Sequence, residues 1–139
     1  MSYLEKELHQ TANYLAWKFD HFANEYGLTG QQLSTIDFLA NQPQWQSTQH
    51  AIELEFNIKR STTAKMLQRM EKAGLVTRKT ASNDRRNKIV SLTPQARVFA
   101  KTARQYLDMR QQRLENRFSS KQLADFEEVL AYLQEKSDD

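Results

Sequence analysis

The chain has 139 residues, the size of one ordinary domain, and contains no cysteine. Disulfide scaffolds, cysteine zinc sites and thiolate nucleophiles are therefore excluded. The formal net charge is only +3, and no segment has the roughly 18 apolar residues of a membrane span. Charged residues stand where a secretory signal would place its apolar run. We therefore expect a soluble cytoplasmic protein with no membrane partner.

Apolar residues at helical spacing predict a first helix over residues 3–25. A second helix should begin after Thr29, because Thr29 and Gln32 match the capping-box pattern. This second helix should end before Pro43, because the residue before a proline is disfavoured in a helix.

The middle of the chain predicts two short helices followed by a hairpin. The helices are expected over residues 48–55 and 60–73. Two strands should follow over residues 75–79 and 88–92, separated by a polar turn over residues 81–86. A helix-turn-helix followed by a hairpin is thus expected.

Two further helices are expected at the C-terminal end. Thr93 and Pro94 have the residue types of an N-cap and a first helical position, and the helix they open should reach residue 117. Ser119 and Gln122 match a second capping box, which opens the last helix.

The positive charge of the chain is concentrated in residues 59–88. This segment holds ten of the 20 Lys and Arg residues and two of the 17 acids, so it carries +8 and the rest of the chain carries −5. A concentrated basic segment in an acidic chain is typical of phosphate binding. A solvated charged surface is the alternative, and charge alone does not decide between them.

The helix over residues 60–73 divides into two faces at 100° per residue. One face is apolar. The other carries two hydroxyls, an amide and three cations within an arc of roughly 120°, and these are Ser61, Thr62, Lys65, Gln68, Arg69 and Lys72. Such side chains bind base edges and phosphates. An ordinary amphipathic helix is the alternative, but a merely solvated face usually mixes both signs of charge.

The hairpin turn carries two adjacent arginines, Arg85 and Arg86. Arginine is favoured in the minor groove of DNA, where the potential is negative. Asp84 is better suited to orient one of these arginines than to contact DNA. An exposed polar turn is the alternative.

These motifs resemble the MarR family of bacterial and archaeal regulators. The resemblance rests on Gly74-Leu75-Val76-Thr77-Arg78, Asp84-Arg85-Arg86, Val90-Ser91-Leu92-Thr93, Ile58-Lys59-Arg60-Ser61-Thr62-Thr63 and Leu67-Gln68-Arg69-Met70-Glu71. The motifs lie between residues 28 and 96, and the flanking helices fit the family layout.

The resemblance implies a mainly α fold with a small β-hairpin wing. A winged helix-turn-helix would span residues 28–93, and residues 1–27 and 94–139 would supply dimerisation helices. The implied partners are double-stranded DNA, with a pseudo-palindromic operator, and a second copy of the chain. The resemblance implies DNA contacts from the recognition helix at Ser61, Thr62, Lys65, Gln68 and Arg69, and from the wing at Arg86, with Arg85 close behind. The full expected DNA-binding set also includes Lys59, Arg60 and Lys72, with Asp84 as support for the wing.

Two other features bear on function. Trp17, His21 and Trp45 could line a pocket for a small aromatic effector, which the resemblance implies for some family members, although plain core and dimer packing is the favoured interpretation. Glu53 stands where the family usually has a small residue, so Glu53 is expected to point outward.

The leading hypothesis is a sequence-specific transcription regulator that acts as a homodimeric repressor and is relieved by a small-molecule effector. A winged-helix module that binds proteins and not DNA is the alternative. The three histidines are widely spaced, so we expect no metal site, and we expect no cofactor. No constellation of side chains supports an enzyme.

Overall fold

The computed structural model describes the backbone of residues 3–81 and 84–135, and their side chains other than those of residues 84–86. The chain divides into two compact units, Met1–Ala103 and Arg104–Asp139. The division falls within one long helix, α5 (Arg97–Arg117).

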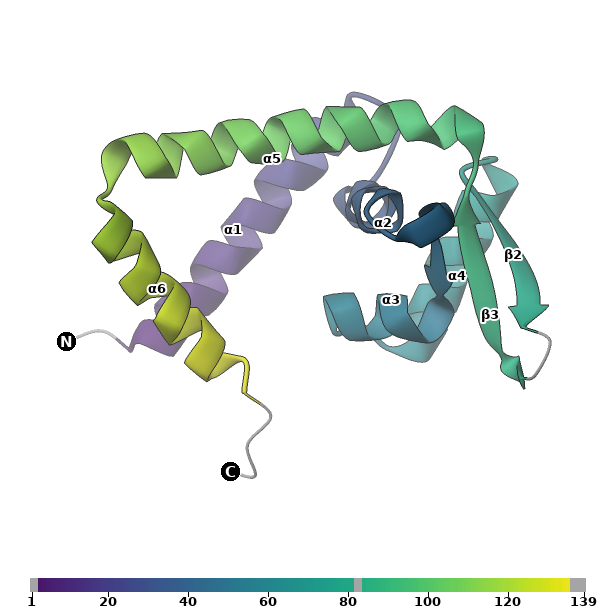
Figure 1. The fold of residues 1–139 in the computed structure, drawn as a ribbon, viewed down its shortest axis with the longest axis horizontal. Coiled ribbons are helices and arrows are strands. Elements are labelled where there is room, and N and C mark those ends of the chain that lie inside the picture. Colours follow the sequence, from purple (N-terminus) through teal and green to yellow (C-terminus); the bar gives the residue numbers. More distant parts are fainter. Residues whose placement is uncertain (1–2, 82–83, 136–139) are drawn as a thin grey trace. The chain divides into compact units, whose positions relative to one another are not determined.

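The first unit holds the first four α-helices, the start of the fifth and the sheet (Figure 1). Its elements before α5 are α1 (Leu4–Asn24), α2 (Gly30–Ala40), the 3₁₀ turn η1 (Pro43–Trp45), β1 (Gln46–Thr48), α3 (Gln49–Phe56), α4 (Arg60–Lys72), β2 (Val76–Ala81), β3 (Asp84–Leu92) and the 3₁₀ turn η2 (Pro94–Ala96). The second unit contains the rest of α5 and α6 (Ser120–Leu133). The predicted fold class, mainly α with a small β wing, is confirmed.

Both predicted capping boxes are present. The Thr29 hydroxyl accepts a hydrogen bond from the Gln32 backbone N–H at 3.1 Å, and the Gln32 side chain accepts one from the Thr29 backbone N–H at 3.0 Å. Ser119 and Gln122 repeat this arrangement at the start of α6. Each box satisfies N–H groups that would otherwise lack a partner in the first helical turn.

The start of α2 lies directly against the backbone of α1. The backbone N–H of Gly30 donates a 2.7 Å hydrogen bond to Oδ1 of Asp20. Gly30 is buried, and a Cβ at this position would lie 3.1 Å from both the backbone N and the Cα of Asp20. The two helices can approach this closely because Gly30 has no side chain.

The hydrophobic core of the first unit is formed where α2, α3 and α4 pack against the sheet. Its fully buried large apolar side chains are Leu33, Ile36, Leu39, Ile52, Leu67, Met70, Val76 and Val90. Leu67 and Met70 come from the face of α4 that the sequence predicts to be apolar, so this prediction is confirmed.

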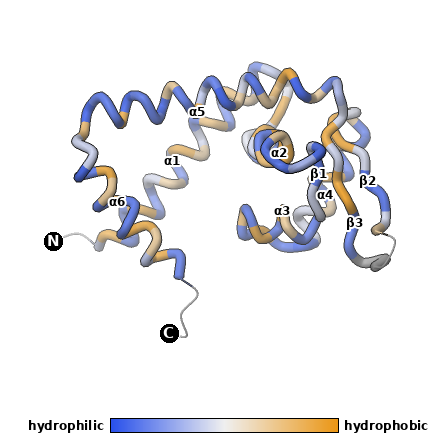
Figure 2. Tube along the Cα trace, in the orientation of Figure 1, coloured by the Kyte–Doolittle hydropathy of each residue, from blue (hydrophilic) through white to orange (hydrophobic). Residues whose placement is uncertain are grey.

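Figure 2 shows α5 as mostly hydrophilic. None of the helices described here combines the length and apolar character needed to cross a membrane.

The sheet has three antiparallel strands in the order β1-β3-β2, one more than predicted. The hairpin prediction was also wrong about length. Strands were expected over residues 75–79 and 88–92, but β2 reaches Ala81 and β3 begins at Asp84. Ala81 pairs with Asp84, so the expected six-residue turn over residues 81–86 is mostly strand.

Candidate nucleic-acid interface

α4 presents one buried face and one exposed face. Thr63, Met66, Leu67 and Met70 are buried. The residues that the sequence places on the opposite side are all exposed, and we call them the polar face of α4: Ser61, Thr62, Lys65, Gln68, Arg69 and Lys72. The structure thus brings these predicted residues together on one surface. Lys59 and Arg60, at the start of the helix, are exposed as well.

The turn between α3 and α4 sets the position of the polar face. Thr48 caps α3 by accepting a hydrogen bond from the Ala51 N–H at 3.1 Å. α3 ends at Asn57, which has a φ of 52° and a left-handed conformation that asparagine tolerates better than most residues. The backbone N–H of Ile58 then bonds to the carbonyl of Glu53 at 3.1 Å, which closes the turn before α4 begins.

Glu53 does not point outward as expected. Its side chain is only 14% exposed, and its Oε1 lies 3.7 Å from Nδ1 of His50, one turn earlier on α3. The expectation came from the small residue that the family usually has at this position. The local packing thus accommodates the acid, while His50 remains exposed.

The base of the wing is held to the end of α4 by hydrogen bonds to Gly74. The hydroxyl of Thr93 donates to the Gly74 carbonyl at 2.7 Å, and the Gln95 amide donates to the same oxygen at 2.6 Å. Gly74 has a φ of 76°, a conformation that glycine adopts without strain. The Ser91 hydroxyl also donates to the side-chain carbonyl of Gln46 at 3.1 Å, which links β3 to β1.

A separate ion pair connects the wing to α4. Arg78 on β2 donates from Nη2 to Oε1 of Glu71 at 3.2 Å. Glu71 is the one acid within α4, and it stands beside the polar face rather than on it. Its charge is therefore opposed by Arg78 next to the candidate DNA-binding surface.

The predicted wing residues Asp84, Arg85 and Arg86 belong to β3 by their backbone, but their side chains lie outside the described residues. The strand register places them in an irregular segment. Thr80 pairs with Lys88, whereas the next residue, Ala81, pairs with Asp84. The backbone of residues 85–87 therefore forms a bulge in β3.

The predicted aromatic pocket residues fall into two groups. The ring centroids of Trp17 and His21 on α1 lie 4.2 Å apart, and Trp17 is exposed. Trp45 packs against the core instead, with the Arg97 guanidinium carbon 3.9 Å from its ring centroid. The structure thus brings Trp17 and His21 together and gives Trp45 a different neighbour.

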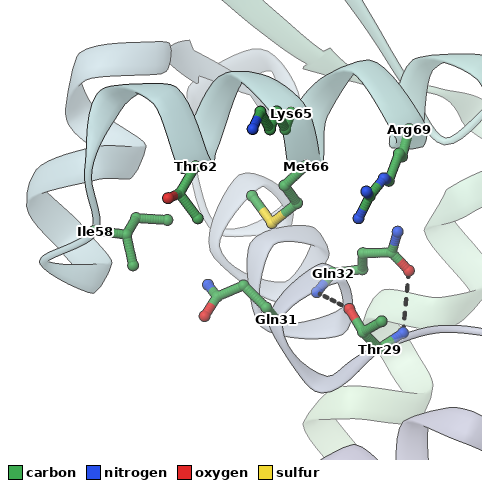
Figure 3. Close-up of a pocket in the computed structure, with 8 residues that line it drawn as sticks. All are labelled: Thr29, Gln31, Gln32, Ile58, Thr62, Lys65, Met66 and Arg69. Atoms are coloured by element: carbon green, nitrogen blue, oxygen red, sulfur yellow. Dashed lines mark hydrogen bonds between the residues drawn. The ribbon is translucent and has the colours of Figure 1, made fainter.

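A cavity of about 310 Å³ lies between the first turn of α2 and the polar face of α4 (Figure 3). Its lining residues are Thr29, Gln31, Gln32, Ile58, Thr62, Lys65, Met66 and Arg69. The sequence analysis did not place the α2 residues at this site. The Thr29–Gln32 capping box indicates the start of a helix, but it does not indicate which surface that helix turn lies against.

Comparison with solved structures decides the family. The transcription regulator MarR from Oenococcus oeni PSU-1 shares 32% sequence identity with this chain and aligns over 94% of this chain and 98% of its own, with a TM-score of 0.76. The chain belongs to the MarR family of transcription regulators. The sequence model of the MarR family matches residues 26–87. A comparison with curated proteins gave no significant match.

Two further MarR-like structures are similar over almost the whole chain. MepR from S. aureus, solved as a DNA complex, has 19% identity and a TM-score of 0.85, and covers 96% of this chain and 97% of its own. At that identity the likeness concerns the fold alone. NadR, solved with 4-hydroxyphenylacetate, has 25% identity and a TM-score of 0.80, and covers 99% of this chain and 96% of its own.

Proposed function

We propose that this MarR-family protein is a sequence-specific DNA-binding regulator that acts as a repressor. The observation that carries the proposal is the polar face of α4, where six exposed side chains include three cations and no acid. The neighbouring acid, Glu71, is paired with Arg78. Lysine and arginine suit guanine or phosphate, glutamine suits adenine, and hydroxyls suit either base or backbone.

In this proposal α4 enters the major groove and the wing reaches the adjacent minor groove. Lys59 and Arg60 join the polar face in contacting DNA at the start of α4. Arg86 supplies the main contact from the wing, with Arg85 close behind it, and Asp84 orients one of these arginines. MepR, with the same fold, has been solved with DNA, which supports this use of the fold.

We further propose that two copies bind one pseudo-palindromic operator. Residues 28–93 would form the winged helix-turn-helix, and residues 1–27 and 94–139 would supply the dimerisation helices. α6 buries none of its residues in the single chain, and its large apolar side chains Phe126, Val129 and Tyr132 are at least half exposed. Soluble monomers seldom leave such surfaces uncovered. The half-sites would then lie roughly 10 base pairs apart, centre to centre.

A small aromatic effector is proposed to relieve repression. The support is the complex of NadR with 4-hydroxyphenylacetate, together with the exposed pair formed by Trp17 and His21. The Arg97 guanidinium covers the ring of Trp45, so an effector would have to displace Arg97 to contact that ring. Packing of these aromatic side chains within the dimer is the competing interpretation.

The proposal is tested by selecting bound fragments from random DNA and measuring the mass of the free protein by light scattering. We expect a two-fold symmetric motif and a dimer at micromolar concentration. Failure to retain any duplex on a filter at low salt would favour the alternative, a winged-helix module that binds other proteins. A monomer in light scattering would contradict the dimer alone.

A further inference from the structure

The cavity between α2 and α4 combines positive charge with hydrogen-bond donors. Lys65 and Arg69 stand one helical turn apart on α4, and Figure 3 shows Arg69 extending toward α2. Gln31 and Gln32 line the cavity from the first turn of α2, where Figure 3 shows Gln32 near Arg69 and Gln31 extending toward the Ile58 end, and Ile58 and Met66 supply the apolar part of the lining. The lining contains no acidic residue, so its chemistry favours an anion.

Three backbone N–H groups at the start of α2 already have partners. The N–H of Gly30 is bonded to Asp20, the N–H of Gln32 to the Thr29 hydroxyl, and the N–H of Leu33 to the Thr29 carbonyl. By contrast, within the described part of the chain nothing forms a hydrogen bond or ion pair with the side chains of Gln31, Lys65 or Arg69. These three side chains are therefore free to bind an anion.

The cavity divides the polar face of α4 into two rows. Thr62, Lys65 and Arg69 line the cavity on the side toward α2, whereas Ser61, Gln68 and Lys72 are not among its lining residues. When a helix lies in the major groove, the residues at the edge of its exposed face meet the sugar–phosphate backbone. The row beside α2 is such an edge, and the groove wall nearest to it would lie against the first turn of α2.

We propose that the cavity holds a backbone phosphate of the bound DNA, so that α2 is a third DNA-contacting element beside α4 and the wing. The Gln31 side-chain amide donates to the phosphate from α2, and Lys65 and Arg69 supply the positive charge from α4. This inference rests on the proposed function, because it requires α4 to bind DNA.

The test is the substitution Gln31→Glu with Gln105→Glu as its matched control. Gln31 is the second residue of α2, where an acidic side chain is favourable to the helix, so Gln31→Glu should not destabilise the fold. Gln105 is exposed on α5 and receives the same change in charge. With a duplex carrying the selected operator, we expect Gln31→Glu to weaken binding about tenfold or more and Gln105→Glu less than about twofold.

A second measurement locates the contact on the DNA. Single phosphates of the operator are replaced in turn by neutral methylphosphonates. One position in each half-site should weaken binding of the wild-type protein, and the same replacement should weaken binding of Gln31→Ala by a smaller factor, because only the contacts of Lys65 and Arg69 remain to be lost. Gln31→Lys should bind more tightly and steepen the dependence of log affinity on log salt, by about 0.9 for each added phosphate contact.

The outcomes separate this inference from the proposed function. If wild-type protein binds no DNA, both fail. If Lys72→Ala weakens binding but Gln31→Glu behaves like Gln105→Glu, the role of α2 is overturned and the proposed function stands. If Gln31→Glu leaves DNA binding unchanged but removes the stabilisation that 4-hydroxyphenylacetate gives against thermal unfolding, the cavity binds small anions and the phosphate proposal is overturned.

Discussion

Glu71 on α4 and Arg78 on β2 form an ion pair in which Nη2 and Oε1 lie 3.2 Å apart. The pair joins the helix that bears the polar face to the first strand of the wing. The Arg78 side chain is only 14% exposed, against 42% for Glu71, and its buried Nε finds no hydrogen-bond partner in the described structure. Glu71 therefore pairs with the mostly buried guanidinium of Arg78, next to the candidate DNA-binding surface.

Removing Glu71 should change stability and DNA binding in opposite directions. Glu71→Ala leaves the covered guanidinium of Arg78 without its acceptor, so the free energy of unfolding should fall by about 1 kcal/mol, an estimate that allows for the exposure of Glu71. Affinity for random duplex at low salt should rise, because a negative charge next to the polar face is lost. Urea denaturation and fluorescence anisotropy measure the two effects. Glu127→Ala on exposed α6 is the control, and equal stabilities for the two variants would contradict a role for the ion pair.

Gln68 and Lys72 should contribute differently to DNA recognition. Gln68 lies in the middle of α4, whereas Lys72 is its last residue and lies closer to the expected path of the backbone. Gln68→Ala should change the sequence selected from random DNA, with a cost of about 1–3 kcal/mol at the affected base pair. Lys72→Ala should weaken binding to all sequences more evenly. An unchanged motif for Gln68→Ala would show that this face does not contact bases as proposed.

Arg86→Ala should lower affinity through charge. A dimer carries the change twice, so the slope of log affinity against log salt should decrease by roughly two units. Asp84→Ala should produce a milder defect through lost orientation of an arginine. The melting temperature should stay close to that of the wild type, because a wing tip contributes little to the core. If Arg86→Ala kept the wild-type affinity at about 150 mM salt and the wild-type slope of log affinity against log salt, the wing would not contribute to DNA binding.

The contact between Arg97 and Trp45 should stabilise the first unit. The guanidinium carbon lies 3.9 Å from the ring centroid, well within the range of a cation–π interaction. Arg97→Met keeps most of the side-chain volume and loses the charge, so it should lower stability by about 0.5–1 kcal/mol, with Arg97→Lys losing less. Arg113→Met on the exposed part of α5 is the matched control. Urea denaturation measures the free energy of unfolding of each variant. Equal losses of stability for Arg97→Met and Arg113→Met would contradict a stabilising cation–π interaction between Arg97 and Trp45.

The helices could be predicted from the sequence because their signals are local. The capping boxes at Thr29 and Ser119 mark helix starts by residue type and spacing, and both occur in the structure. β1 could not be predicted in this way, since three polar residues carry no strand pattern. Gln46–Thr48 form a strand because they pair with β3, where Gln46 lies opposite Ser91.

The candidate site was predictable only in part, because some of its features are local in sequence and others depend on contacts between distant segments. The polar face of α4 follows from helical periodicity within one segment, and the structure exposes all six of its residues. The cavity depends on the proximity of Gln31 and Arg69, which are far apart in sequence and related only by the packing of α2 against α4. The bulge in β3 likewise depends on pairing register, which the polar composition of residues 81–86 did not indicate.

The contact between Gly30 and Asp20 has a mechanical consequence. Because the hydrogen bond is 2.7 Å long and a Cβ at Gly30 would lie only 3.1 Å from the Asp20 backbone, α1 and the first turn of α2 cannot slide far past each other without breaking this bond. Any force that shifts α1 at this crossing is therefore transmitted to the turn that carries Gln31. That turn is one wall of the cavity whose other wall carries Lys65 and Arg69. Because the crossing ties α1 to this turn, a displacement of α1 is expected to change the width of the gap in front of α4.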